Sequence, residues 1–309
     1  MNRYRMIPWL MTMSILAACV PQPGVVATTT LPAVSEITPT SVLPTPIPPT
    51  ATVLPALSDT QLKNATLFVP VYQREVTLVD GQFEAPGELW VRLLPWIAFG
   101  DLNSDGLEDA AILLAESGGG SGTFVSLVAV INQNGQPLQS GTTTIDDRPI
   151  ITGVEITAGK IEVTGSIHRL SDPFCCPTLP VIQNYVLDGV QLVLIRQTTT
   201  TPSGATRVIN INSPLSGSQT GSAVQVQGDM PIAPFENNLL YQVYDLSFNV
   251  LDAGPFAVNA SEPGGPATFD NQVSSPAFTP GSSVWFELSE ISPADGTPLV
   301  IERIKLTIQ

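Results

Sequence analysis

The sequence predicts a mostly β protein with two folded domains, an antiparallel-sheet domain over residues 58–197 and a β-sandwich over residues 207–309. Three observations carry this prediction. Short segments rich in β-branched and aromatic residues recur along both regions, glycine-containing turns separate them, and a Thr/Pro/Gly linker over residues 198–206 lies between the two regions. Regular short strands joined by such turns are typical of antiparallel sheets and sandwiches.

The first domain begins with a helix signal and continues as strands. Ser58 followed by Gln61 forms a capping-box pattern, which predicts a short helix over residues 59–65. Asp-Gly and Asn-Gly pairs between β-branched runs predict hairpins. The expected strands and hairpins are 76–83 around Asp80-Gly81, 123–131 ending at Asn134-Gly135, 150–157 with 160–167, and 185–194 around Asp188-Gly189.

The second domain shows period-two alternation of apolar and polar residues. The alternation is clear in residues 223–228, which stop at Gly228, and in residues 300–308. Further strands are expected at 209–214, 239–245 and 283–288. About seven short strands within a hundred residues are typical of a β-sandwich. Within the adjacent pair Trp285-Phe286, one ring should face inward and the other outward, with core packing explaining both.

The N-terminus carries the features of a secretion signal. Arg3 and Arg5 precede an apolar run from Met6 to Ala18. That run is shorter than the roughly 20 residues needed to span a bilayer, and it has the length of a signal-peptide core. The run ends in Leu16-Ala-Ala-Cys19, which resembles the lipobox of bacterial lipoproteins.

By this resemblance, residues 1–18 are a signal peptide and Cys19 becomes the lipid-modified first residue of the mature chain. The alternative is an ordinary signal peptide followed by a chance cysteine. Two acyl chains hold a protein on a membrane stably. The expected location is therefore the extracytoplasmic face of the cell membrane, with the lipid anchor as the contact with the membrane.

Residues 19–57 are expected to be a disordered stalk. From residue 20 on, the segment holds nine prolines and eight threonines, with Glu36 as its only charge. Proline-rich chain favours extended polyproline II and acts as a semi-rigid spacer.

Composition limits the partners. The chain has 12 basic and 27 acidic residues, a formal net charge of −15. Nucleic-acid binding needs a basic surface, so this balance excludes it as a partner. An envelope protein or a neutral glycan remains compatible with the charge.

An acidic stretch lies just before an apolar run. Oxygen-bearing side chains occupy positions 1, 3, 5 and 9 of a tight loop, Gly106 permits the sharp turn, and a backbone carbonyl is available at position 7. The predicted ligand positions are Asp101, Asn103, Asp105, Leu107 and Asp109.

This is the first part of a calcium loop. Ile112 stands where an EF-hand needs its glutamate, so the stretch resembles instead the calcium loops of integrin-type β-propeller repeats. We expect a structural Ca²⁺ ion. The alternative is a metal-free turn whose side chains accept hydrogen bonds from their own backbone.

Cys175 and Cys176 are adjacent, and Pro177 follows. Adjacent Cα atoms lie closer together than in ordinary disulfides. Two buried thiols and a vicinal disulfide both remain open. A metal pair is disfavoured because His168 is the sole histidine.

The first domain resembles a known group of proteins. Residues 58–197 are similar to a family of uncharacterised secreted or lipid-anchored bacterial proteins, through pieces such as Gly100–Gly106 and Asp172–Thr178. That family usually has Leu-Gly-Asp-Arg where this chain has Ile145-Asp-Asp-Arg148.

The second domain resembles the immunoglobulin-like domain of bacterial spore germination proteins. The matching pieces are Ile211–Pro214, Val226–Gly228, Phe235-Glu236, Leu251 with Gly254-Pro255, Phe269, and Asp295–Pro298. The resemblance implies an immunoglobulin-like β-sandwich that serves as a non-catalytic module on surface proteins. Any link to sporulation rests on this resemblance alone.

The leading functional hypothesis is therefore a non-catalytic, lipid-anchored binding or envelope-scaffold protein. The first alternative is an envelope hydrolase that uses Asp105 with Asp109 or Glu108 as acid and base around a cation. His168 has no obvious serine or cysteine partner in the sequence, which argues against an enzyme. A sensing or solute-presenting lipoprotein is the third possibility.

Overall fold

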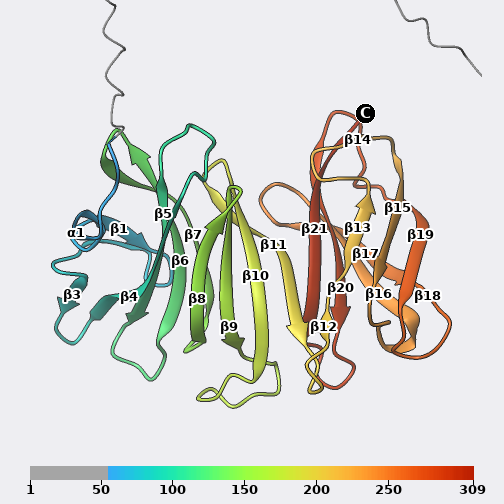
Figure 1. The fold of residues 1–309 in the computed structure, drawn as a ribbon, viewed down its shortest axis with the longest axis horizontal. Helices are drawn as coiled ribbons and strands as arrows, with labels where there is room; N and C mark the ends of the chain where they lie inside the picture. Colours follow the sequence, from blue (N-terminus) through green and yellow to red (C-terminus); the bar gives the residue numbers. More distant parts are fainter. Residues whose placement is uncertain (1–54) are drawn as a thin grey trace, which may run out of the picture. The chain divides into compact units, whose positions relative to one another are not determined.

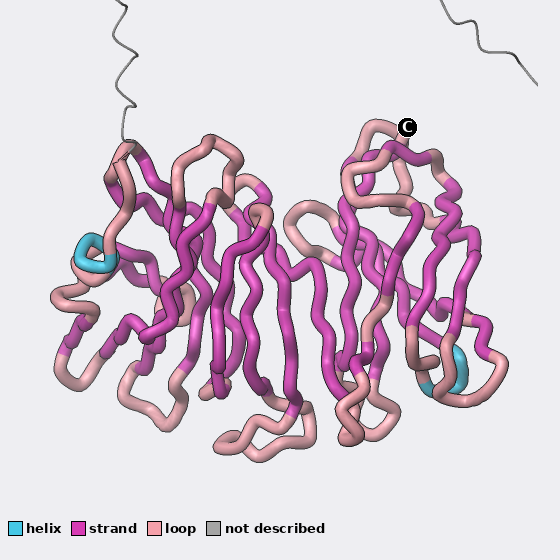
Figure 2. Tube along the Cα trace, in the orientation of Figure 1, coloured by secondary structure: helices cyan, strands magenta, loops and turns pink. Residues whose placement is uncertain are grey.

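Residues 55–309 are built almost wholly from antiparallel strands (Figures 1 and 2). The computed structural model describes these residues. The expected signal peptide, Cys19 and nearly all of the stalk lie outside them. Within the described part, no helix combines the length and the apolar character that crossing a bilayer requires. The prediction of a mostly β fold is confirmed.

The first domain contains a five-stranded antiparallel sheet in the order β3-β4-β5-β6-β7. Its strands are β3 (Gln82–Ala85), β4 (Leu89–Gly100), β5 (Asp109–Ser117), β6 (Phe124–Gln133) and β7 (Gln136–Asp147). β5 is buried along its whole length because both faces of the sheet are covered, which explains its continuous apolar run. Asn134 and Gly135 have φ values of 54° and 85°, as the predicted turn between β6 and β7 requires.

One face of this sheet is covered by the first elements of the domain. These are α1 (Asp59–Leu62), β1 (Thr66–Val69) and β2 (Arg74–Thr77). The Ser58–Gln61 capping box is present, although the helix is shorter than expected. Leu57 is buried in this core, and the Pro55 carbonyl accepts a hydrogen bond from Asn132. The last residues assigned to the stalk therefore belong to the folded domain, which corrects the expected boundary.

The expected hairpin over residues 76–83 is only partly right. The Asp80-Gly81 turn is present, with φ values of 50° and 80°. However, the two flanking segments pair with each other only through a single bridge between Val79 and Gln82. β2 pairs with β1, whereas β3 pairs with β4. A local turn signal cannot reveal that β2 and β3 pair with different strands, because the choice of partner strand depends on the core that each strand covers.

The opposite face of the five-stranded sheet packs on four strands that follow it. These are β8 (Ile150–Thr157), β9 (Lys160–Ile167), β10 (Leu179–Asp188) and β11 (Gln191–Thr200). The core between the two layers includes Leu113 and Leu127 on one side and Ile161, Val163 and Tyr185 on the other. The predicted strand pair 150–157 and 160–167 forms as expected.

The second domain is a two-layer β-sandwich. One layer has the order β13-β15-β19-β18, and the other contains β17-β16-β20-β21. The strands are β13 (Asn210–Ser213), β14 (Gln219–Thr220), β15 (Ala223–Met230), β16 (Asn238–Tyr244), β17 (Val250–Ala257), β18 (Asn259–Ala260), β19 (Ala267–Ser274), β20 (Ser283–Ile291) and β21 (Pro298–Ile308), with a 3-10 turn η1 (Phe235–Asn237). Gly228 lies where β13, β15 and β19 meet, and a Cβ there would collide with the Asn210 carbonyl and the Phe269 ring.

The two ends of the expected linker 198–206 belong to a sheet and only residues 201–205 form a turn, which is a second correction. Thr198 to Thr200 belong to β11, and β12 (Thr206–Arg207) turns back to pair with it. β11 also pairs with β21 at Arg196↔Glu302 and Gln197↔Ile301. One sheet therefore runs β17-β16-β20-β21-β11-β10-β9-β8 through both domains (Figure 1). A Thr-rich segment is compatible with either a linker or a strand, and the pairing of Thr198–Thr200 with β10 and β12 makes it a strand.

Partly buried ion pairs reinforce this junction. Arg196 binds Glu302 through two hydrogen bonds of 2.5 and 2.8 Å. Arg303 pairs with Glu287 and donates to the Leu194 carbonyl at 2.6 Å, while Tyr244 and Phe248 lie beside its guanidinium. Because Arg303 spans the sandwich and β11, it ties the second domain to the first.

Replacing Arg303 by methionine should destabilise the protein by about 3–5 kcal/mol, because it leaves the Glu287 carboxylate buried and unpaired. Urea unfolding of the two proteins measures the difference. The matched control is Arg74→Met, which breaks the exposed Arg74–Glu88 pair and should cost at most about 1 kcal/mol. Equal losses in the two variants would show that the junction does not depend on Arg303.

Candidate functional site

The acidic loop connects β4 to β5. The Asp101 carboxylate accepts hydrogen bonds from the Ser104 and Gly106 amides at 2.7 and 3.0 Å. Asp105 accepts from the Leu107 amide at 2.8 Å. Desolvation acts to raise the pKa of Asp101, but the amide donors of the turn together outweigh it and lower the pKa. These bonds fix the tight turn.

Asp109 differs from the other acidic residues because it is fully buried. Its two carboxylate oxygens accept from the Leu102 and Asn132 amides at 2.9 and 2.8 Å. Burial raises the pKa of Asp109, and these two donors offset the effect only in part. Asp109 therefore holds the loop to the end of β6.

The predicted ligand set is only partly assembled. Asp101, Asn103 and Asp105 share one turn, with Asn103 donating to Asp105 at 2.9 Å, while Asp109 is engaged with backbone donors. Across residues 55–309, no cluster of three or more acidic, His or Cys side chains has the arrangement of a metal site. The side chains thus adopt the self-capping turn that was the alternative, and calcium binding stays a prediction.

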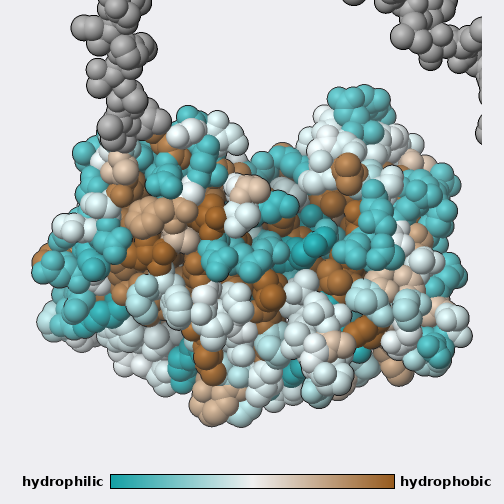
Figure 3. Space-filling model, in the orientation of Figure 1, coloured by the Kyte–Doolittle hydropathy of each residue, from teal (hydrophilic) through white to brown (hydrophobic). Residues whose placement is uncertain are grey.

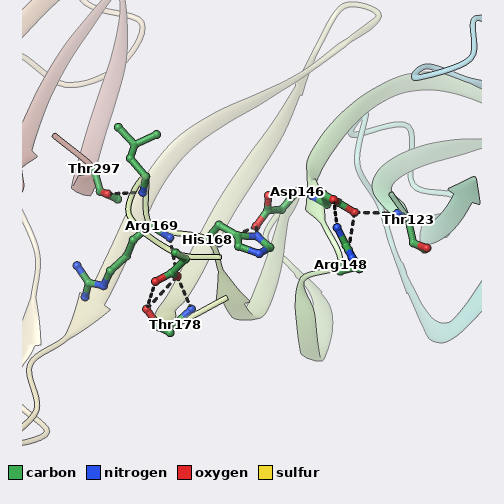
Figure 4. Close-up of polar contacts among 10 residues, drawn as sticks. Thr123, Asp146, Arg148, His168, Arg169, Thr178 and Thr297 are labelled. Carbon is green, nitrogen blue, oxygen red and sulfur yellow. Dashed lines mark hydrogen bonds and ion pairs between the residues drawn. The ribbon is translucent and has the colours of Figure 1, made fainter. Parts of the chain in front are cut away.

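A second candidate site is the loop of residues 168–178 between β9 and β10 (Figure 4). The Asp146 carboxylate accepts from both the backbone amide and Nδ1 of His168, at 2.6 and 2.8 Å. His168 Nε2 is buried and has no partner among the described residues. The Asp146 contact places the proton of the neutral ring on Nδ1. Asp146 therefore supplies the histidine's partner.

The Asp172 side chain links the two ends of the loop by hydrogen bonds. Its carboxylate accepts from the Arg169 amide at 2.9 Å and from the amide and hydroxyl of Thr178. The Arg169 amide contributes most to lowering the pKa of Asp172. The loop also reaches the second domain, because the Leu170 amide donates to Thr297 at 2.8 Å and Ser171 donates to Asp295 at 2.7 Å. This loop is therefore fixed by both domains.

Cys175 and Cys176 lie in this loop, both exposed, and are joined as a disulfide with their Cα atoms 3.8 Å apart. Exposed Phe174 precedes them, and buried Pro177 follows. Of the two states that the sequence left open, the structure holds the vicinal disulfide and not the buried thiols.

A groove of about 550 Å³ is the third candidate site, and no pattern in the sequence predicts it. Its apolar wall includes Phe68, Leu138, Val190 and Phe248. Its polar lining carries hydroxyl and amide groups and a single charge. The polar residues are Thr66, Glu75, Gln139, Ser140, Thr142 and Gln191. The face drawn in Figure 3 likewise carries apolar patches bordered by hydrophilic ones.

Phe248 reaches the groove from the second domain. It lies in the β16–β17 turn with φ of 62°, a conformation that bulky residues rarely adopt. Its ring stacks on Trp285 at a centroid distance of 6.1 Å. Trp285 and Phe286 do point to opposite faces of β20, yet both are buried, because Phe248 and Lys305 cover the Trp285 ring. No sequence signal brings residue 248 to residues 66–75 and 137–142.

The comparisons with known proteins concern the second domain. Residues 208–297 match the model of the Gmad2 family, described as the immunoglobulin-like domain of bacterial spore germination. No curated protein and no solved structure is similar enough to the chain to count as a match. Residues 208–297 are therefore an immunoglobulin-like Gmad2 domain, as the resemblance implied.

Proposed function

We propose that this chain is a lipid-anchored, non-catalytic scaffold protein on the extracytoplasmic face of a bacterial membrane, and that it binds an envelope glycan. The composition of the groove lining is the observation that carries the choice of ligand. Apolar surface beside hydroxyl and amide groups suits a sugar ring, which has apolar faces and hydroxyl edges. Glu75 is the one charge in the lining, so a neutral or cationic glycan fits better than an anionic polymer.

The junction between the domains supports the scaffold role. A sheet that continues from β8 to β17, with the Arg196–Glu302 pair and the Arg303–Leu194 hydrogen bond across the junction, holds the groove walls in fixed positions. Phe248 then meets the first-domain residues without a hinge. Preformed sites lose less conformational freedom on binding.

The arrangement of the acidic loop does not favour the Asp105–Asp109 pair of the hydrolase alternative. Asp109 is buried with both oxygens bonded to backbone amides, whereas Asp105 is exposed. A general acid and base must both reach the substrate. His168, the sole histidine, is paired with Asp146 and is not part of this loop.

A glycan array followed by titration of the purified chain tests the ligand. Neutral glycans on the array should retain the wild-type chain. Val190→Arg should weaken this binding at least about tenfold, or about 1.4 kcal/mol, because a long charged side chain then enters the groove. Val79→Arg is the matched control: Val79 is similarly exposed, at 67% against 74% for Val190, but lies outside the groove lining. Absence of any retained glycan, or equal loss in both variants, would refute the assignment.

The lipid anchor is tested by fractionating cells. The wild-type chain should be found with membranes and carry acyl groups on Cys19, whereas Cys19→Ala should lose both properties. Recovery of unacylated wild-type chain in the soluble fraction would contradict the proposal.

We further propose that Ca²⁺ binds the acidic loop as a structural ion, held by the oxygens of Asp101, Asn103 and Asp105, with the Leu107 carbonyl and Asp109. The bound ion would neutralise the mutual repulsion of carboxylates gathered in nine residues. Calcium at ten times its dissociation constant should add about 1.4 kcal/mol of stability.

Thermal melts in calcium and in EDTA measure this effect. Asp105→Asn keeps an oxygen for the Leu107 amide but removes the charge, so its melting temperature should respond less to calcium. Asp80→Asn, in a turn elsewhere, should respond as the wild type does. Identical wild-type melts in calcium and EDTA would show that the loop is stabilised by its backbone hydrogen bonds alone.

A further inference from the structure

The loop between β9 and β10 presents a chemical group at its exposed tip. Cys175 and Cys176 are both exposed, and Phe174 and Leu170 in the same loop are 82% and 73% exposed. Phe174 is the most exposed large hydrophobic residue in the described part of the chain.

This disulfide cannot serve as an ordinary structural cross-link. A disulfide stabilises a fold mainly by closing a loop in the unfolded chain, and the stabilisation grows with the length of that loop. A bond between neighbouring residues closes the shortest loop there is. It also joins no two elements of the fold, because both cysteines belong to one turn.

The loop keeps its position by other means. Asp172 fixes its two ends to each other, Asp146 holds His168, and Thr297 and Asp295 bind Leu170 and Ser171 from the second domain. None of these bonds involves a sulfur atom. The polar framework can therefore persist whether the cysteines are oxidised or reduced.

We propose that Cys175–Cys176 is a redox-active site that exchanges electrons with an extracytoplasmic protein dithiol. Disulfides that are exposed and do not stabilise the fold are the ones that take part in thiol–disulfide exchange. Phe174 precedes Cys175 directly, Leu170 lies in the same loop, and their exposed side chains offer apolar contact surface to the dithiol protein. The exchange does not depend on glycan binding.

The exchange proceeds in two displacement steps. A thiolate of the partner attacks one sulfur of the pair, forming a mixed disulfide and releasing the other cysteine as a thiolate. The second partner thiol, once deprotonated, attacks the mixed disulfide and releases the remaining cysteine. The partner is oxidised to a disulfide, the pair gains two electrons, and the two protons lost by the partner thiols go to the released thiolates. The reverse sequence reoxidises the pair.

The experiment uses the full chain, purified without reductant after alkylation of free thiols in intact cells. Dithiothreitol is then added under native conditions, and newly exposed thiols are alkylated and located by peptide mass spectrometry. Before reduction, Cys175 and Cys176 should carry no alkyl group. After reduction, each should carry one, with one equivalent of oxidised dithiothreitol formed. The melting temperature should stay unchanged, and oxidised glutathione should restore the disulfide.

Two variants serve as controls. Cys175→Ser/Cys176→Ser should oxidise no dithiothreitol at the loop. Cys175→Ser alone leaves one thiol, which should form a stable mixed disulfide with glutathione if the site is accessible.

Two outcomes would overturn the proposal. One is recovery of both cysteines as alkylated thiols from intact cells. The other is a disulfide that dithiothreitol reduces only after the protein is unfolded.

Discussion

The pairing of β11 with β21 is the constraint on which the rest of the structure depends. Only two residue pairs form this ladder, yet it merges the sheets of both domains into one. Its stability comes from the side chains around it, chiefly Arg303 with Glu287 and Arg196 with Glu302. Ion pairs that are wholly or partly buried fix the geometry of neighbouring elements, because their hydrogen bonds form in one arrangement only.

Both the groove and the cysteine loop follow from this junction. The groove takes its walls from β1, β2, β7 and the start of β11 with the preceding turn in the first domain, and from Phe248 of the second. The loop of residues 168–178 is held at Asp146 by the first domain and at Thr297 by the second. Relative movement of the domains would alter both sites at once. A fixed junction therefore suits a protein that presents surfaces more than one that closes around a substrate.

Carboxylates in this acidic chain are placed in contrasting environments. Asp172 and Asp295 accept hydrogen bonds near the surface, which lowers their pKa values. Asp109, Glu290 and Glu302 lie in buried positions, where desolvation raises the pKa. Arg207 and Arg196 offset that effect for the two glutamates. Three arginines, Arg196, Arg207 and Arg303, thus pair with buried glutamates.

The sequence by itself determined the β class, the helix cap at Ser58, the turns at Asp80-Gly81 and Asn134-Gly135, and the nature of the second domain. These features depend on neighbouring residues or on period-two alternation, so they can be read locally. Only the tertiary structure decided that β2 and β3 pair with different strands, that residues 198–200 join a sheet, and that Asp146 meets His168. It also brought together residues 66–75, 137–142, 190–192 and Phe248, which line the groove. Strand partners and long-range contacts are selected by the burial of whole faces and by charge pairing across the junction, which no short stretch of sequence encodes.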